Sequence, residues 1–240
     1  MDHSPHHGTE KPTFIKPILD GPSARLEASL SLAIHEHRLL PGMKLREDEL
    51  CEIYGVSRTA VRTALQSLYH SQLVEIKRNR GAFVAKPSAR EALEVFEARS
   101  LLEPHIAFEA AKRITDEDIQ HLESHMLEEH AAIAAREHGR ALRLSGQFHI
   151  DIARIADQST IQGMIEKLVS RSSLIIAVYW GRKSALCEKH AHHALLKAFK
   201  LRDGHDAKEL MQSHLVDILA ALDLKKDTDA EYNLRDILKG

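Results

Sequence analysis

The sequence predicts a mainly α-helical protein in which three helices and a β-hairpin precede an all-α antiparallel helical bundle. The prediction depends on where the strand signals lie. β-Branched and aromatic residues flank a turn containing Asn and Gly between residues 73 and 85, as expected of a hairpin. From Ser88 onward apolar residues recur at helical spacing without a further strand signal. Glycine and proline interrupt the first third of the chain and become sparse later.

The first unit is expected over residues 20–86 and has clear start and stop signals. Asp20-Gly21-Pro22-Ser23 indicates a turn and helix start, and Leu40-Pro41-Gly42 ends that helix. A short helix is expected near 47–54, and Gly55 stops it. Ser57 can cap a third helix that runs to about His70. The hairpin strands are expected at 73–78 and 82–85.

The second unit is expected over residues 87–226, with a boundary near Lys86-Pro87. Its helical patterns run over 88–113, 116–138, 140–156, 160–180, 185–202 and 206–224. Ser88 with Glu91, and Asp206 with Glu209, have the spacing of capping boxes. Pro104 is expected to kink the first of these helices. Residues 1–19 and 227–240 are expected to form disordered tails.

Composition favours an ordinary cytoplasmic protein. The 240 residues are 43% hydrophobic and 28% charged, with a formal net charge of −2. The two cysteines, Cys51 and Cys187, form neither a disulfide framework nor a metal motif. The longest strongly apolar run, Leu174–Trp180, is far shorter than the roughly 20 residues of a membrane-spanning helix. We therefore expect no membrane partner.

The near-neutral total conceals a basic region. Between Tyr54 and Lys86 the sequence has six basic residues and one acidic residue, Glu75. Such a patch attracts phosphate, although charge alone favours a solvated face. The predicted third helix adds a more specific signal, because Arg58 and Arg62 are four residues apart and share a face. Arginine recognises guanine through two donors, so this helix has the features of a major-groove reader.

The same region resembles the winged helix-turn-helix of the GntR family of bacterial regulators. The resemblance lies in Leu40-Pro41-Gly42-Met43-Lys44-Leu45, Glu49-Leu50, the run from Tyr54 to Arg62, Leu73-Val74, and the run from Asn79 to Val84. It implies that the third helix contacts bases or phosphates and that the hairpin tip enters the minor groove. The DNA-contacting residues expected on this basis are Arg46, Ser57, Arg58, Thr59, Arg62, Asn79, Arg80 and Gly81.

The remainder of the chain resembles the all-helical effector domain of the FadR subgroup, the FCD domain. The resemblance lies in Glu97 to Pro104, Ala110-Ala111, Phe148-His149, His192 to Leu196, and Met211 to Leu215. It implies a domain that binds a small metabolite and forms a homodimer.

Three histidines, His149, His192 and His214, lie on apolar faces of separate predicted helices. One such histidine is more often a core residue, but three facing histidines can bind a divalent cation of the zinc or nickel type. Metal-binding members of the subgroup usually carry an aspartate one turn before the first histidine, and here that position is Ser145. Either three imidazoles suffice to bind the metal, or this protein has lost the metal.

Arg99 is expected to line the cavity that these three histidines face. There it could bind a carboxylate effector or pair with Glu103, four residues further on. Arg171 is a second candidate. The effector-binding residues expected are Arg99, Ser145, His149, Arg171, His192 and His214.

These features predict a sequence-specific transcription regulator, expected to be a repressor, that binds an inverted repeat as a homodimer. A small metabolite, expected to be a carboxylate, controls it. The alternative is a metal-dependent hydrolase that uses His149, His192 and His214 to activate water. The sequence offers it no clearly placed general base and no catalytic motif.

Overall fold

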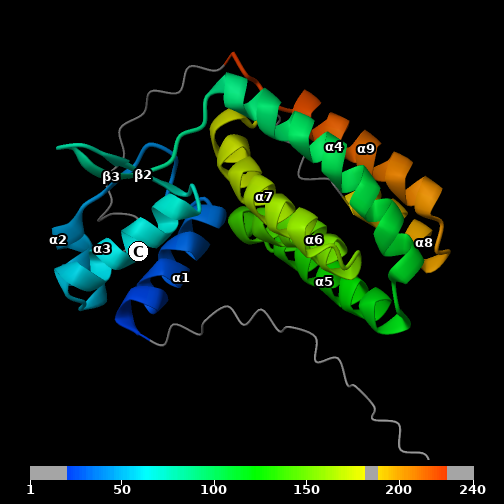
Figure 1. Ribbon diagram of the computed structural model, residues 1–240, viewed down its shortest axis with the longest axis horizontal. Helices are drawn as coiled ribbons and strands as arrows, with labels where there is room; N and C mark the ends of the chain where they lie inside the picture. The colour runs from blue at the N-terminus through cyan, green and yellow to red at the C-terminus, as the bar shows by residue number, and fades with distance from the viewer. Residues whose placement is uncertain (1–20, 182–188, 226–240) are drawn as a thin grey trace, which may run out of the picture.

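The computed structural model describes residues 21–181 and 189–225, and it confirms the predicted fold class (Figure 1). The predicted tails at 1–19 and 227–240 lie outside the described residues. The N-terminal elements follow the expected order: α1 (Pro22–His35), β1 (Lys44–Leu45), α2 (Glu47–Tyr54), α3 (Arg58–His70), β2 (Val74–Lys77) and β3 (Gly81–Val84). Gly55 ends α2 in the left-handed conformation, with φ of 64°, which glycine adopts without steric cost.

The sheet corrects one expectation. We expected a two-stranded hairpin, but the described residues form a three-stranded antiparallel sheet in the order β1-β3-β2. Lys44 of β1 pairs with Phe83 of β3, and Glu75 of β2 pairs with Phe83 from the other side. The additional strand has only two residues, so it carries no periodic pattern that a sequence could reveal.

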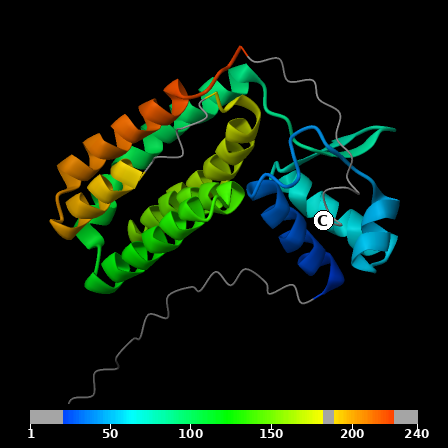
Figure 2. The ribbon, with the colours of Figure 1, turned by 180° about the vertical axis from the view of Figure 1, so that it is seen from behind.

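The C-terminal helices form the expected antiparallel bundle, in which α4 and α9 lie side by side (Figures 1 and 2). They are α4 (Ala89–Arg113), α5 (Asp116–Ala134), α6 (His138–Ile155), α7 (Ser159–Tyr179), α8 (Lys189–Lys200) and α9 (Gly204–Ala220). Helix α4 continues through Pro104.

The predicted N-terminal cap is present in α4, but the predicted cap of α9 is wrong. The Ser88 side chain accepts a hydrogen bond from the backbone N–H of Glu91, as expected of an N-cap. The expected capping box of Asp206 with Glu209 is wrong. Asp203 caps α9 and accepts from the N–H of Asp206 at 3.0 Å, because the helix begins two residues earlier, at Gly204.

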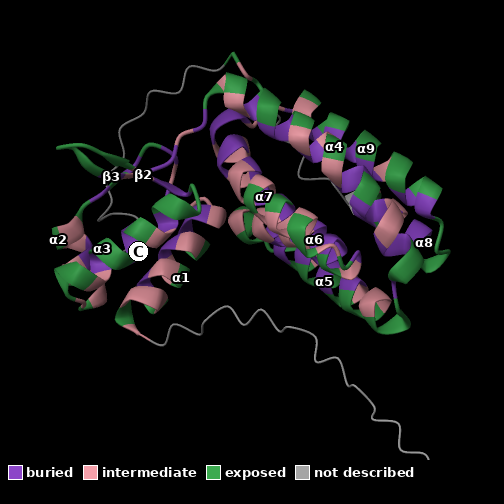
Figure 3. Ribbon diagram, viewed as in Figure 1, coloured by how far each residue is buried: buried purple, intermediate pink, exposed green. Residues whose placement is uncertain are grey.

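Buried apolar side chains form one core beneath α1, α3 and the sheet, and another between the helices of the bundle (Figure 3). The bundle core is built around Phe96, Phe148 and Phe199. Leu174 of α7 is fully buried in the N-terminal core rather than in the bundle core. Helix α7 therefore contributes packing to both parts of the protein.

The C-terminal end of α1 is docked against α6 and α7 (Figures 1 and 2). Nε2 of His35 is 2.9 Å from Oγ of Ser170, and Nε2 of His37 donates to the carbonyl oxygen of Ser173 at 2.9 Å. At Gly139 of α6 the backbones approach so closely that an added Cβ would lie 1.9 Å from the carbonyl oxygen of Glu36. These contacts join the two parts through half-buried polar groups.

None of the helices in the described residues is long and apolar enough to cross a membrane.

Candidate functional site

The start of α3 presents a polar surface, as the sequence predicted. Ser57 caps the helix by accepting from the N–H of Ala60 at 3.2 Å. Arg58, Thr59 and Arg62 are exposed. The buried face of the helix consists of Val61, Ala64, Leu65 and Leu68. The hydrophobic stripe therefore fixes the orientation of α3 and turns its arginines outward.

Arg62 is paired with an acidic residue of α2. Its Nε donates to both carboxylate oxygens of Glu47 on α2, at 2.9 and 3.1 Å, while its side chain is 67% exposed. Exposed ion pairs contribute about 0–1 kcal/mol, so a phosphate or a base can replace Glu47 at small cost. Arg46, at the N-cap of α2, is exposed and lies 3.9 Å from Glu49.

The tip of the β2–β3 turn carries the predicted Asn79, Arg80 and Gly81, all exposed. Asn79 and Gly81 have φ of 59° and 93°, which suits their residue types. The structure adds cations that the sequence prediction did not include. Lys44 and Lys77 lie 5.7 and 5.2 Å from the centre of the Phe83 ring, and the Arg80 guanidinium lies 5.9 Å from it. Lys44 joins this cluster only because β1 pairs with β3.

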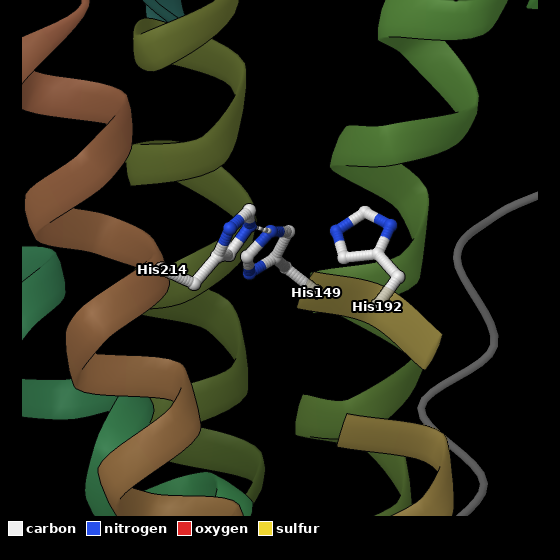
Figure 4. A group of neighbouring side chains, drawn as sticks. All are labelled: His149, His192 and His214. Atoms are coloured by element: carbon white, nitrogen blue, oxygen red, sulfur yellow. Dashed lines mark hydrogen bonds between the residues drawn. The ribbon is translucent and has the colours of Figure 1, made fainter. Parts of the chain in front are cut away.

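The bundle brings the three predicted histidines together (Figure 4). His149 on α6, His192 on α8 and His214 on α9 each offer a ligand atom, and these atoms all lie within 4.8 Å of one another. All three side chains are buried. Nε2 of His214 is 3.3 Å from Nε2 of His149. We call these three residues the histidine cluster.

Two buried glutamates orient this cluster, and the sequence prediction assigned neither of them to the cluster. Nδ1 of His149 donates to Oε2 of Glu103 at 2.6 Å, and Nδ1 of His192 donates to Oε2 of Glu129 at 3.1 Å. A carboxylate can only accept, so in the neutral rings Nδ1 carries the proton and Nε2 carries the lone pair. Carboxylates that bond the outer nitrogen of a histidine are typical of metal-binding histidines.

Burial favours the neutral forms of the His149 and His214 imidazoles. It lowers the pKa of both His149 and His214, although Glu103 partly opposes this effect for His149. Burial by itself raises the pKa of Glu103, but Arg99 and His149 outweigh it and hold that pKa at about 2. For His149 this combines a neutral imidazole with an ionised carboxylate behind the ring.

The structure shows Arg99 paired with Glu103, one of the two roles considered for it. Nε of Arg99 lies 2.5 Å from Oε1 of Glu103 and Nη2 lies 3.3 Å from Oε2. Both side chains are almost completely buried, at 3% and 2% exposure. Such a pair is tolerated in the interior only when its charges and hydrogen bonds are well matched.

A cavity of about 1050 Å³ adjoins the cluster and runs between α6 and α7 to α1. Arg99, Ser145 and His149 line it, among the residues predicted to bind the effector. Arg171 is not among the lining residues described. It pairs with Glu91 and donates to the carbonyl oxygen of Gln72 at 2.9 Å. Arg171 therefore connects α7 to the sheet end of the N-terminal part.

Comparison with known proteins matches two family models to the chain. Residues 22–84 match the family described as bacterial regulatory proteins, gntR family, and residues 94–217 match the FCD domain. The HTH-type transcriptional repressor RspR of Escherichia coli K12 is 28% identical over 183 residues, covering 75% of this chain and 79% of its own. The Exu regulon transcriptional regulator of the same strain is 28% identical over 235 residues, covering 87% of each chain.

Solved structures confirm the fold. McbR/YncC of E. coli superposes with a TM-score of 0.74 at 22% identity, covering 83% of this chain and 96% of that one. A GntR regulator from Rhodococcus sp. RHA1 also gives 0.74 at 22% identity, covering 82% and 95%. The gntR family model matches the winged helix-turn-helix, and the FCD model matches more than half of the chain. The protein therefore belongs to the GntR family of bacterial transcription regulators that carry an FCD domain.

Proposed function

We propose that this regulator is a cytoplasmic repressor controlled by a small carboxylate, which binds beside a divalent cation held by His149, His192 and His214. The observation that carries the proposal is the histidine cluster itself. Three buried imidazoles from three helices have ligand atoms within 4.8 Å of one another, and two of the rings are oriented from behind by Glu103 and Glu129.

The donor set fits a divalent cation of the zinc or nickel type. Neutral imidazoles are the usual nitrogen ligands of these ions, and three protein ligands leave a position open. Ser145, where related metal sites usually carry an acid, lies one turn before His149 and lines the cavity. We propose that three histidines suffice because the ionised Glu103 supplies negative charge behind His149. A cation bound there would offer a Lewis-acidic position to the carboxylate of the effector.

The names of curated relatives support repression and an acidic effector. RspR is named as a transcriptional repressor, and a further E. coli relative, 28% identical over 207 residues, is named the galactonate operon transcriptional repressor. Galactonate is a carboxylate. The hydrolase alternative has no support, because the gntR family model and these relatives describe transcription regulators.

Each chain presents one such recognition helix, α3, and helix-turn-helix proteins usually read two half-sites with a twofold dimer. We therefore propose a homodimer on an inverted repeat. Arg58 and Arg62 would contact the major groove, and the cations around Phe83 would contact the backbone or minor groove. The effector controls DNA binding only if it binds two arrangements of the winged domains with different affinity.

The direct test begins by selecting bound fragments from the genome of the source organism with the purified, zinc-supplied protein. The selected DNA should contain an inverted repeat, and one or more small carboxylates should release it in a mobility-shift titration. A protein that retains no specific fragment contradicts the regulator assignment. DNA release that proceeds equally well in a His149→Ala/His214→Ala variant contradicts control through the histidine cluster.

A further inference from the structure

The cavity beside the histidine cluster does not end inside the bundle. His149 of α6 lines it at the histidine cluster, and Ser31 and His35 of α1 line it as well. Helix α1 belongs to the winged helix-turn-helix, since it lies within the residues that match that family. A molecule that fills the cavity therefore contacts the DNA-binding domain directly.

The α1 end and the histidine cluster are separated along α6 by a distance that a small molecule can span. Arg143, which lines the α1 end, precedes His149 by six residues. With a rise of 1.5 Å per residue, this is roughly 9 Å along the helix axis. Ligand pockets commonly have volumes of about 300–1,000 Å³, so the cavity of about 1050 Å³ has room for one elongated ligand.

The α1 end is lined by groups that exchange hydrogen bonds rather than by charge alone. Nδ1 of His35 is 3.3 Å from Oγ of Ser31, and Nε2 of His35 is 2.9 Å from Oγ of Ser170 on α7. All three side chains are partly exposed and line the cavity. Hydroxyls and an imidazole can both donate and accept, which suits the hydroxyl groups of a ligand.

We propose that Ser31 and His35 of the winged domain are effector-binding residues, and that the effector is an acid with hydroxyl groups at the end remote from its carboxylate. The proposal rests on the proposed function, which places the carboxylate at the histidine cluster. The far hydroxyls bond Ser31, His35 and Ser170. Since the bond from His35 to Ser170 joins α1 to α7, a ligand that bonds these groups replaces a contact between the domains with contacts to itself.

This arrangement explains how one ligand favours a different pose of the winged domain. A ligand shifts an equilibrium only through contacts that differ between the two states. Contacts with both α1 and the bundle depend directly on the position of α1 relative to α7. The carboxylate end supplies affinity in either pose, and the hydroxylated end distinguishes the poses.

The test uses isothermal titration of the full-length, zinc-supplied protein with three acids: gluconate, hexanoate and acetate. Gluconate and hexanoate have chains of the same length, and only gluconate carries hydroxyls. Gluconate should bind at least tenfold more tightly than the other two. A Ser31→Ala/His35→Gln variant should lose about tenfold in gluconate affinity and leave the affinities for hexanoate and acetate unchanged.

Arg171→Gln is the matched control, because Arg171 also connects α7 to the N-terminal part but does not line the cavity. It should leave the gluconate affinity within twofold of wild type. Ser31→Ala alone tests the same contact with a single change that favours the helix, should the double variant fail to fold.

The outcomes separate the two proposals. Any of three results overturns the role of Ser31 and His35. The first is that gluconate binds no more tightly than hexanoate, the second that its affinity is unchanged in both Ser31 variants, and the third that its affinity falls as much in Arg171→Gln. Carboxylate control of the cluster survives that result. Failure of all three acids to bind overturns control by a carboxylate, and this inference with it.

Discussion

The Oε2 atom of Glu103 accepts hydrogen bonds from Nδ1 of His149 at 2.6 Å and from Nη2 of Arg99 at 3.3 Å. One buried carboxylate therefore links an internal ion pair to a predicted metal ligand. The consequence is that Arg99, although it lines the cavity, acts on the histidine cluster through Glu103. A change at Arg99 should alter the cluster even when the effector is absent.

The glutamate behind His192 should strengthen metal binding. Glu129→Gln keeps an acceptor for Nδ1 but removes the negative charge, which makes the imidazole a weaker ligand. Loss of such an outer partner typically costs 10–100-fold in metal affinity, and we expect a loss of about tenfold in a zinc competition titration with a chromophoric chelator. Glu128→Gln is the control, because the neighbouring Glu128 is 62% exposed on the same helix. Equal zinc affinity in both variants would show that Glu129 only fills space.

The exposed arginines of α3 should carry sequence recognition. Arg58→Ala and Arg62→Ala are each expected to weaken operator binding by about 1–3 kcal/mol without changing the melting temperature. Fluorescence anisotropy with a selected operator fragment measures the effect. Arg90→Ala, on the exposed face of α4 outside the winged domain, should leave binding unchanged. If all three variants bind alike, α3 is not the recognition helix.

The close approach of α6 to α1 predicts opposite effects for two glycines. Gly139→Ala places a Cβ 1.9 Å from the Glu36 carbonyl oxygen, so the two backbones must separate and thermal stability should fall. Gly163→Ala on α7 has no atom within 4 Å of its added Cβ. Alanine stabilises a helix interior by about 0.5–1 kcal/mol relative to glycine, so its melting temperature should rise. Two increases, or two decreases of the same size, would contradict the docked arrangement.

His37 should make stability depend on pH. Burial lowers its pKa from 6.5 to about 4, with a smaller contribution in the same direction from His35, while the bond to Ser173 opposes the shift. The unfolded chain therefore binds more protons between these values, and the free energy of unfolding falls as the pH drops through this window. Between pH 7 and pH 5 the loss attributable to His37 is about 2 kcal/mol.

His37→Asn removes this titration and suits the left-handed conformation of the residue, with φ of 55°. Urea unfolding at the two pH values should show a smaller pH dependence for His37→Asn than for wild type. A pH dependence that is identical in wild type and His37→Asn would contradict the prediction.

Much of this architecture was predictable because it is encoded locally. The stripe of Val61, Leu65 and Leu68 orients α3, and local spacing was enough to place its arginines outside. Contacts between distant segments were not predictable in the same way. Strand β1 has two residues and is defined only by pairing with β3, so Lys44 was missed.

The histidine cluster shows the same limit. Apolar spacing placed each histidine on a buried face, but it could not identify the carboxylates behind them. Glu103 is 46 residues from His149, and Glu129 is 63 residues from His192. Arg171 was predicted to bind the effector, but the structure places it in a contact with Gln72 and Glu91. A charged residue on a helix does not reveal which neighbour it will meet.

The most direct test of the account is the metal content of the purified protein. Wild type and a His149→Ala/His214→Ala variant are prepared without chelators, supplied with zinc, passed through a desalting column and analysed by mass spectrometry. We predict about one zinc ion per chain in wild type and almost none in the variant, since the variant retains only His192 of the three ligands. The same sub-stoichiometric zinc in both proteins would contradict a metal centre at the histidine cluster.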